Sequence, residues 1–201
     1  MIVSLIATID RELAISQDGR YPWDIPADVA RFDQLTHGHH VILGRQAYFD
    51  RYLDQGATAL LGRRVIVLTG NPERYRPILP PTVELVTSMQ AALAIAKAAK
   101  DTEVFLAGGS EVYDLGMAYA DRLYLTRINT QLKTGKIKRF PRWIDHRWLV
   151  QQTKGPYLTE GHTYSYQELV YTPPKDEGRI RVRTKTRATH TAVTPAESAG
   201  E

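Results

Sequence analysis

The most constraining feature of this sequence is the alternation of short apolar stretches with helical patterns over its first two thirds. The apolar stretches are rich in β-branched residues, which is typical of strands buried on both faces of a sheet. Between them, apolar residues recur at helical spacing, as Val29 and Phe32 do. We expect strands at 2–9, 40–43, 64–69, 82–86, 103–107 and 122–129, and helices at 28–36, 45–52, 89–100 and 110–119.

The last third of the pattern changes from alternation to strands alone. Residues 147–154 and 163–172 alternate apolar and polar side chains, as an antiparallel edge pair does. Together these patterns predict an α/β fold with a mixed, mainly parallel sheet and helices on both faces. Pro173 and Pro174 close the domain, so we expect one domain over 1–174 and a basic, disordered tail over 175–201.

Composition excludes several classes of protein. Apolar residues make up 43% of the 201 residues, which is enough for a packed core. The sequence has no apolar run of about 18 residues, as a membrane-spanning helix requires. It begins with a strand-like apolar stretch that lacks the basic segment of a signal peptide. Because cysteine is absent, disulfides and thiolate chemistry are excluded, and we expect a cytoplasmic protein.

The net charge of +4 is mild and unevenly placed. Residues 175–201 hold six Lys/Arg and four Asp/Glu, hence +2, and no dense basic face precedes them. We therefore expect no nucleic acid and no membrane as partner, and a monomer. The histidines His39 and His40 are adjacent near a strand start, so they point to opposite faces and cannot chelate one ion. We expect no metal.

An acidic residue opens the first predicted helix in the string Trp23-Asp24-Ile25-Pro26-Ala27-Asp28. One interpretation is that Asp28 merely caps the helix or complements its dipole. The other is that Asp28 turns inward beside Phe32, where a carboxylate in an apolar cleft binds an N–C–N edge through two hydrogen bonds. Local sequence leaves both interpretations open.

Glycines follow two of the predicted strands. Gly44 and Arg45 come after 40–43, and Gly108-Gly109-Ser110 come after 103–107. Each could be a plain turn, but glycines let backbone N–H groups approach a phosphate or ring closely. Ligands of open α/β sheets bind at the carboxyl ends of the strands, so the two sites together indicate a ligand there.

Taken in order, these strings resemble the dihydrofolate reductase family. The resemblance rests on SLIATID, YPWDIPADVARFDQLT, HVILGRQAY, GRRVIVLT, VFLAGGSEVY, DRLYLTRI, the FP at 140–141 and HTYSYQELVY. These strings cover nearly all of residues 1–172, and PW-x-x-PAD-x-x-x-F is the most specific among them. The resemblance implies an eight-stranded mixed sheet with four helices, and reduction of 7,8-dihydrofolate to tetrahydrofolate with NADPH.

The resemblance also implies a substrate site. Asp28 matches the buried carboxylate that holds the 2-amino and N3 edge of the pterin and supports protonation of N5 as hydride reaches C6. Thr126 matches a threonine in the same hydrogen-bond network, and Tyr21 and Trp23 belong to the loop over the nicotinamide. Arg63 matches the arginine that binds the α-carboxylate of the substrate's glutamate. The pocket wall corresponds to Ile6, Val29, Phe32, Ala107 and Tyr113.

A cofactor site is implied beside it. The backbones of Thr8 and Ile15 match those that orient the nicotinamide carboxamide, and Arg45 and Gly109 match positions near the phosphates. The full set of implied cofactor contacts is Ala7, Thr8, Ile15, Gly44, Arg45, Gln46, Ala47, Leu68, Thr69, Gly108, Gly109, Ser110 and Glu111.

The sequence departs from the family pattern at several of these positions. Tyr21 stands where many members have Leu or Met, and Ser16 stands where the mobile loop usually has glycine. Ala47 replaces a common threonine, and Gly70 follows Thr69 where a basic or hydroxyl residue often meets the 2′-phosphate. Preference for NADPH over NADH is therefore left open. Two alternatives also remain: a binding protein of this fold with little turnover, and a pyrimidine-intermediate reductase of flavin synthesis, which would lack the carboxylate of Asp28.

Overall fold

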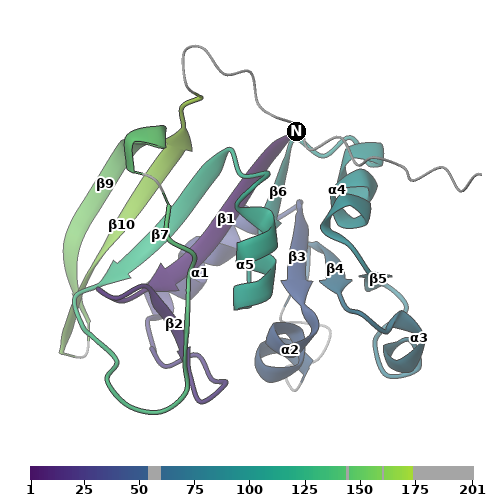
Figure 1. Cartoon of the computed structure of the whole chain (residues 1–201), viewed down its shortest axis with the longest axis horizontal. Coiled ribbons are helices and arrows are strands. Elements are labelled where there is room, and N and C mark those ends of the chain that lie inside the picture. Colours follow the sequence, from purple (N-terminus) through teal and green to yellow (C-terminus); the bar gives the residue numbers. More distant parts are fainter. Residues whose placement is uncertain (54–59, 144, 160, 174–201) are drawn as a thin grey trace, which may run out of the picture.

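One eight-stranded sheet runs through the computed structural model, which describes residues 1–53, 60–143, 145–159 and 161–173 (Figure 1). The strand order is β5-β4-β3-β6-β1-β7-β10-β9. The six strands from β5 to β7 pair in parallel, whereas β10 is antiparallel to β7 and to β9. The strands are β1 (Ile2–Ile9), β3 (His40–Gly44), β4 (Arg64–Leu68), β5 (Glu84–Val86), β6 (Glu103–Leu106), β7 (Arg122–Ile128), β9 (Trp148–Thr159) and β10 (His162–Tyr171).

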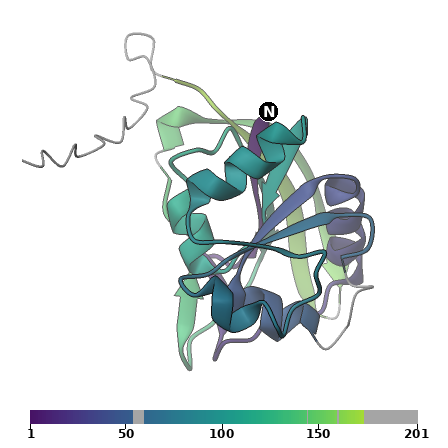
Figure 2. The same ribbon diagram turned by 90° about the vertical axis from the view of Figure 1, so that its right-hand side faces the viewer.

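Helices cover both faces of this sheet. Figure 2 shows α1 on one side, and α4 and α5 on the other. A π-helical turn, Phe49–Leu53, continues α2, and a 3-10 turn, Asp145–Arg147, precedes β9. The α-helices of the described ranges are α1 (Pro26–Thr36), α2 (Arg45–Tyr48), α3 (Pro72–Tyr75), α4 (Met89–Ala98) and α5 (Ser110–Gly116).

The predicted fold class is confirmed, and the eight predicted strands and four predicted helices are all present. Two short features differ from expectation. The single turn α3 was not predicted. Nor was β2 (Ala14–Gln17), which pairs with β8 (Ile137–Arg139) in a separate two-stranded sheet. The predicted tail at 175–201 lies outside the described residues. Within the described ranges, no helix has the length and apolar character needed to cross a membrane.

The central strand β1 is buried on both faces, and its alternation decides which side chains meet α1. Leu5 and Ala7 pack in the cluster that includes α4 and α5, whereas Ile6 packs in the cluster on the α1 side. Because side chains of a strand alternate between faces, Thr8 lies on the same face as Ile6. A threonine in an otherwise apolar strand is thus directed at the first helix.

A hydrogen-bonded cluster joins the turn after α4 to the start of β3. The carboxylate of Asp101 lies 2.7 Å from Nδ1 of His39 and 2.6 Å from Nδ1 of His40, and it accepts the backbone N–H of His40 at 2.8 Å. Burial alone would raise the pKa of Asp101, but the hydrogen bonds from His39 and His40 lower this pKa to about 2. Sequence-adjacent histidines therefore share one carboxylate.

Candidate active site

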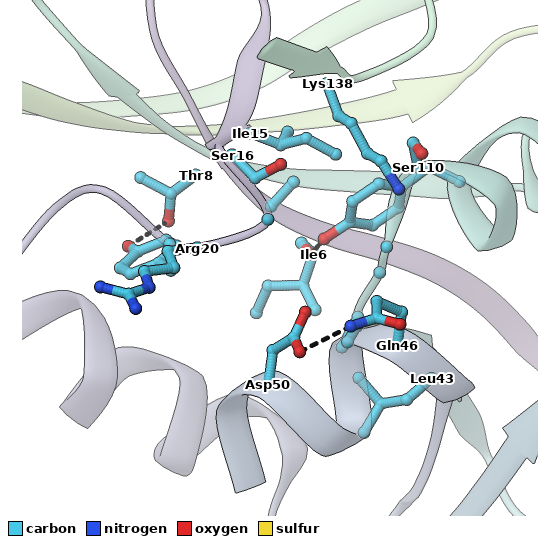
Figure 3. Close-up of a pocket in the computed structure, with 18 of the residues that line it drawn as sticks. Ile6, Thr8, Ile15, Ser16, Arg20, Leu43, Gln46, Asp50, Ser110 and Lys138 are labelled. Carbon is cyan, nitrogen blue, oxygen red and sulfur yellow. Dashed lines mark hydrogen bonds between the residues drawn. The ribbon is translucent and has the colours of Figure 1, made fainter. Parts of the chain in front are cut away.

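A cavity of about 390 Å³ opens at the carboxyl ends of β1, β3 and β6 (Figure 3). Helices α1, α2 and α5 supply further walls, and the small β2–β8 sheet supplies Ile15, Ser16 and Lys138. The position agrees with the rule that open α/β sheets bind ligands at the carboxyl ends of their strands. A cavity of this size can hold ligands of small-molecule dimensions.

One end of the cavity is marked by the buried carboxylate of Asp28, which is 8% exposed in the first turn of α1. Thr8 donates its hydroxyl hydrogen to Oδ2 of Asp28 at 2.5 Å, and Thr126 donates to Oδ1. The two threonines are register partners on the parallel strands β1 and β7, so each stands opposite one oxygen. Asp28 is therefore held in place from the sheet, and its side chain is not an N-terminal cap of α1, since that helix has no side-chain cap bond.

Tyr21 adds a phenol to this hydroxyl cluster. Its oxygen lies 3.1 Å from Oγ1 of Thr8 and 3.2 Å from Oδ2 of Asp28. The ring of Tyr21 meets the ring of Trp23 edge to face, with centroids 5.5 Å apart. Trp23 is buried and packs with Ile25 and Tyr164, so it supports Tyr21 from outside the cavity.

Arg31 and Tyr166 lie near Asp28 but outside the cavity. Arg31, one turn further along α1, places its guanidinium 4.5 Å from the ring centroid of Tyr166. Burial lowers the pKa of Arg31, while the negative charge of Asp28 acts in the opposite direction. The pKa of Tyr166 is raised, first by burial, then by its hydrogen bond with Tyr164 and by neighbouring charges including Asp28. Asp28 thus has a nearby counter-charge with which it forms no direct ion pair.

The other end of the cavity is built from backbone. Gly44 donates its N–H to the carbonyl of Gly108 at 2.7 Å, which joins the ends of β3 and β6. A Cβ at Gly44 would lie 3.5 Å from the nitrogen of Gly109, and Gly108 has a φ of +99° that favours glycine. A Cβ at Gly44 would thus make ordinary van der Waals contact, whereas at Gly108 it would also crowd the phenol of Tyr113. A phosphate or ring therefore has access to backbone groups here.

Polar side chains surround that end. Figure 3 shows Lys138 extending from β8 toward Ser110 at the start of α5. Gln46 donates from Nε2 to Oδ1 of Asp50 at 2.7 Å, and both line the opposite wall (Figure 3). This end therefore combines one cation with one carboxylate, whereas the other is dominated by hydroxyl groups around Asp28.

Most residues expected at the site come together in this cavity. Thr126 lies directly behind Asp28 and is 1% exposed. Lining residues among those expected are Ile6, Ala7, Thr8, Ile15, Tyr21, Asp28, Phe32, Gln46, Ala47, Ala107, Gly108, Gly109, Ser110 and Tyr113.

Val29, expected in the pocket wall, is 48% exposed and does not line the cavity. The helical repeat of 3.6 residues explains this. Phe32 follows Asp28 by four residues, slightly more than one turn, so both side chains face inward. Val29 follows Asp28 by a single residue and points in a different direction. Val29 is displaced toward solvent on the flank of α1.

Arg63 is held by the end of α1 and does not line the cavity. Its guanidinium donates to Oγ1 of Thr36 at 2.7 Å, to the carbonyl of Leu61 at 3.0 Å and to Oδ1 of Asp33 at 2.6 Å. It also lies 5.4 Å from the ring centroid of Phe32. The expected carboxylate contact of Arg63 therefore has a competitor in Asp33, whose side chain is 54% exposed.

The remaining expected cofactor residues lie outside the cavity lining. Gly44 supports the backbone bond described above, and Arg45 lies 5.0 Å from the ring centroid of Tyr75. Leu68 and Thr69 are buried at the end of β4, and Glu111 is exposed on α5. These residues border α2 and α5 and do not contact the space beside Asp28.

Several lining residues were missed by sequence reasoning. Gly19 and Arg20 lie in the loop after β2, Leu43 is the next-to-last residue of β3, and Asp50 and Tyr52 lie in the π-helical turn. A weak signal existed for Asp50, which follows Gln46 at helical spacing. Lys138 carried no such signal, because the pairing of β2 with β8 joins distant segments. Ser16 was noted above only as a departure from the glycine of the mobile loop.

Among the described residues, no group of three or more His, Asp or Glu side chains gathers as metal ligands would. The acidic groups of the cavity, Asp28 and Asp50, make hydrogen bonds with hydroxyl and amide groups. The arrangement suits recognition of a heterocycle edge at one end and of an anion or ring at the other.

Comparison with known proteins gives a consistent picture. The family model for dihydrofolate reductase matches residues 2–172. A dihydrofolate reductase of Bacillus subtilis is 28% identical over 170 residues, covering 85% of this chain and 94% of that protein. Dihydrofolate reductase type 3 of Salmonella typhimurium is 33% identical over 148 residues, covering 74% and 83%. A dihydrofolate reductase of Haemophilus influenzae is 28% identical over 174 residues, covering 86% and 99%.

Proposed function

The chain belongs to the dihydrofolate reductase family, and from this we propose that it reduces 7,8-dihydrofolate to 5,6,7,8-tetrahydrofolate by hydride transfer from NADPH. The observation that carries the proposal is the buried carboxylate of Asp28, held by Thr8 and Thr126 at the end of a cavity. A carboxylate at such a position binds two parallel N–H donors of a planar ring.

Asp28 is proposed to hold the 2-amino and N3 edge of the pterin. The ring would then lie along the apolar wall formed by Ile6, Phe32 and Ala107. Thr8 and Thr126 hold the carboxylate in one orientation, which fixes the position of the pterin relative to the cofactor. Positioning of this kind supplies a large part of the rate in two-substrate reactions.

The far end of the cavity fits a nicotinamide dinucleotide. Gly108 and Gly109 line the cavity, and Lys138 adds a cation. When bound, the cofactor supplies the hydride, and the protein supplies binding and orientation. We propose that Ala7, Thr8, Ile15, Gln46, Ala47 and Ser110 contact the nicotinamide half, and that Arg45, Leu68, Thr69 and Glu111 contact the remainder.

A proton must reach N5 of the pterin as hydride reaches C6. Asp28 is proposed to favour this protonation by placing negative charge at the opposite edge of the ring. Tyr21 and Phe32 narrow the cavity beside Asp28 and limit the water that reaches the ring. Tyr113, which donates its phenol hydrogen to the carbonyl of Ile6 at 2.8 Å, contributes to the opposite wall.

We further propose that Arg63 binds the α-carboxylate of the substrate's glutamate. Its guanidinium is already oriented by Thr36 and Leu61, and Asp33 occupies the donor that the substrate would use. Arg63 lies against the ring of Phe32, beside the apolar wall.

Steady-state kinetics test this function. The purified protein is expected to oxidise NADPH only when dihydrofolate is added, and parallel assays with NADH measure the cofactor preference. Cofactor or pterin binding without substrate-dependent oxidation would instead favour the alternative of a binding protein with little turnover.

A further inference from the structure

Tyr21 places a third hydroxyl group against a carboxylate that two threonines already hold. Its oxygen is 3.2 Å from Oδ2 of Asp28, the same oxygen that receives the hydrogen of Thr8 at 2.5 Å. Thr126 donates to Oδ1. The ring of Tyr21 lines the cavity, whereas Thr126 approaches from behind.

The hydrogen bonds from the protein leave Asp28 with few lone-pair positions for a ligand. A carboxylate offers about four lone-pair positions, two on each oxygen. Within the described contacts, Thr8 and Tyr21 use both positions on Oδ2, and Thr126 uses one on Oδ1. A heterocycle with two parallel N–H donors needs one position on each oxygen. Such a ligand can bind fully only after Tyr21 withdraws its hydrogen from Oδ2.

Thr8 offers the phenol a second acceptor. Its oxygen lies 3.1 Å from the oxygen of Tyr21 and has lone pairs available, since its own hydrogen is directed at Asp28. A rotation of the phenol hydrogen from Asp28 to Thr8 therefore releases Oδ2 without moving the ring. The phenol then exchanges a hydrogen bond to the charged Asp28 for a weaker one to the neutral oxygen of Thr8, and a two-donor ligand must supply that difference.

We propose that Tyr21 is a specificity-determining residue whose phenol competes with the two-donor edge of the heterocycle for Oδ2 of Asp28. The class of heterocycle rests on the proposed function. A ligand with one donor uses the remaining position on Oδ1 and does not meet this competition. Tyr21 thus lowers affinity selectively for ligands that engage both oxygens of Asp28.

The test measures equilibrium binding without turnover. Dissociation constants are determined, in the absence of cofactor, for dihydrofolate and for its 2-desamino-2-methyl analogue, which presents only N3–H to the carboxylate. Tyr21→Phe is expected to tighten dihydrofolate binding about 2- to 10-fold, the equivalent of the difference between a hydrogen bond to a charged acceptor and one to a neutral acceptor. Binding of the analogue is expected to stay within about twofold.

A second variant distinguishes competition for Oδ2 of Asp28 from a change in the packing of Tyr21. Thr8→Val removes the other donor to Oδ2, so Tyr21→Phe added to Thr8→Val is expected to give no further gain for dihydrofolate. Tyr119→Phe is the matched control, because the phenol of Tyr119 accepts from Gln90 away from the cavity. It should leave both dissociation constants unchanged.

Three results would overturn the inference. Unchanged or weaker dihydrofolate binding by Tyr21→Phe would show that the phenol does not compete, and an equal gain for both ligands would assign the effect to packing. An undiminished gain in the Thr8→Val background would contradict the acceptor count. If the wild-type protein turns over dihydrofolate but shows one of these results, the inference fails alone. If it binds neither ligand, the proposed function fails with it.

Discussion

Asp28→Asn most directly tests whether Asp28 binds the substrate or only stabilises the start of α1. Asparagine has nearly the same shape, so Thr126 can still donate to the remaining carbonyl oxygen. The NH₂ group replaces the oxygen that receives Thr8, and the negative charge is lost. A two-donor heterocycle then meets one neutral acceptor and one opposing donor.

The size of the effect follows from the bonds that are lost. Two hydrogen bonds to a charged acceptor are worth about 3–6 kcal/mol together, and one neutral bond of about 1 kcal/mol remains. The net loss of about 2–5 kcal/mol corresponds to a fall in kcat/KM of roughly 30- to 5,000-fold. Part of the rate should return in acid, where the substrate arrives already protonated.

The assay combines NADPH oxidation across pH with thermal unfolding. Asp28 lies in the first turn of α1, so removing its charge should cost about 0.3–1 kcal/mol of stability, a change in Tm of a few degrees. Asp24→Asn makes the same chemical change at an exposed position in the preceding loop and should leave kcat/KM unaltered. Unaltered kcat/KM in folded Asp28→Asn protein would refute the reasoning, and outright unfolding would make Asp28 a structural residue.

Three further perturbations probe the framework of the site. The ionised carboxylate of Asp101 stabilises the fold fully above its ordinary pKa of 3.8, and this contribution is lost as the pH falls through about 2. Urea unfolding near neutral pH should show that Asp101→Asn is about 1–2 kcal/mol less stable than wild type. The difference should vanish in strong acid. Thr126→Val keeps the shape of the side chain but removes the donor to Oδ1 of Asp28, so kcat/KM should fall about 2- to 10-fold. An unchanged kcat/KM would argue that the hydroxyl of Thr126 does not orient Asp28. Gly116→Ala places a methyl group 2.1 Å from Cδ2 of Leu106 and should cost about 1–3 kcal/mol in the same unfolding assay, whereas Gly70→Ala, which has open space around it, should cost less than about 0.5 kcal/mol.

Local pattern was sufficient for the main elements of the fold. The β-branched runs of β1, β3, β4 and β6 and the helical spacing in α1 are short-range signals, and each element appears where it was predicted. The pair β2 and β8 escaped prediction because the sequences AISQ and IKR are short and lack the apolar run that marks β6, a strand of similar length. Such strands are stable only when they pair with each other and pack on the rest of the fold.

Sequence alone determined that an acidic residue opens α1 and that glycines follow two parallel strands. Helix starts, turns and strand ends depend on only a few residues that are adjacent in the sequence. Sequence could not decide whether Asp28 faced inward, which partners held it, or where Arg63 pointed. Tertiary structure decided these points through the register that sets Thr8 beside Thr126, and through the packing of Arg63 on the end of α1. Register depends on how all the strands bury their faces together, so no local stretch of sequence contains it.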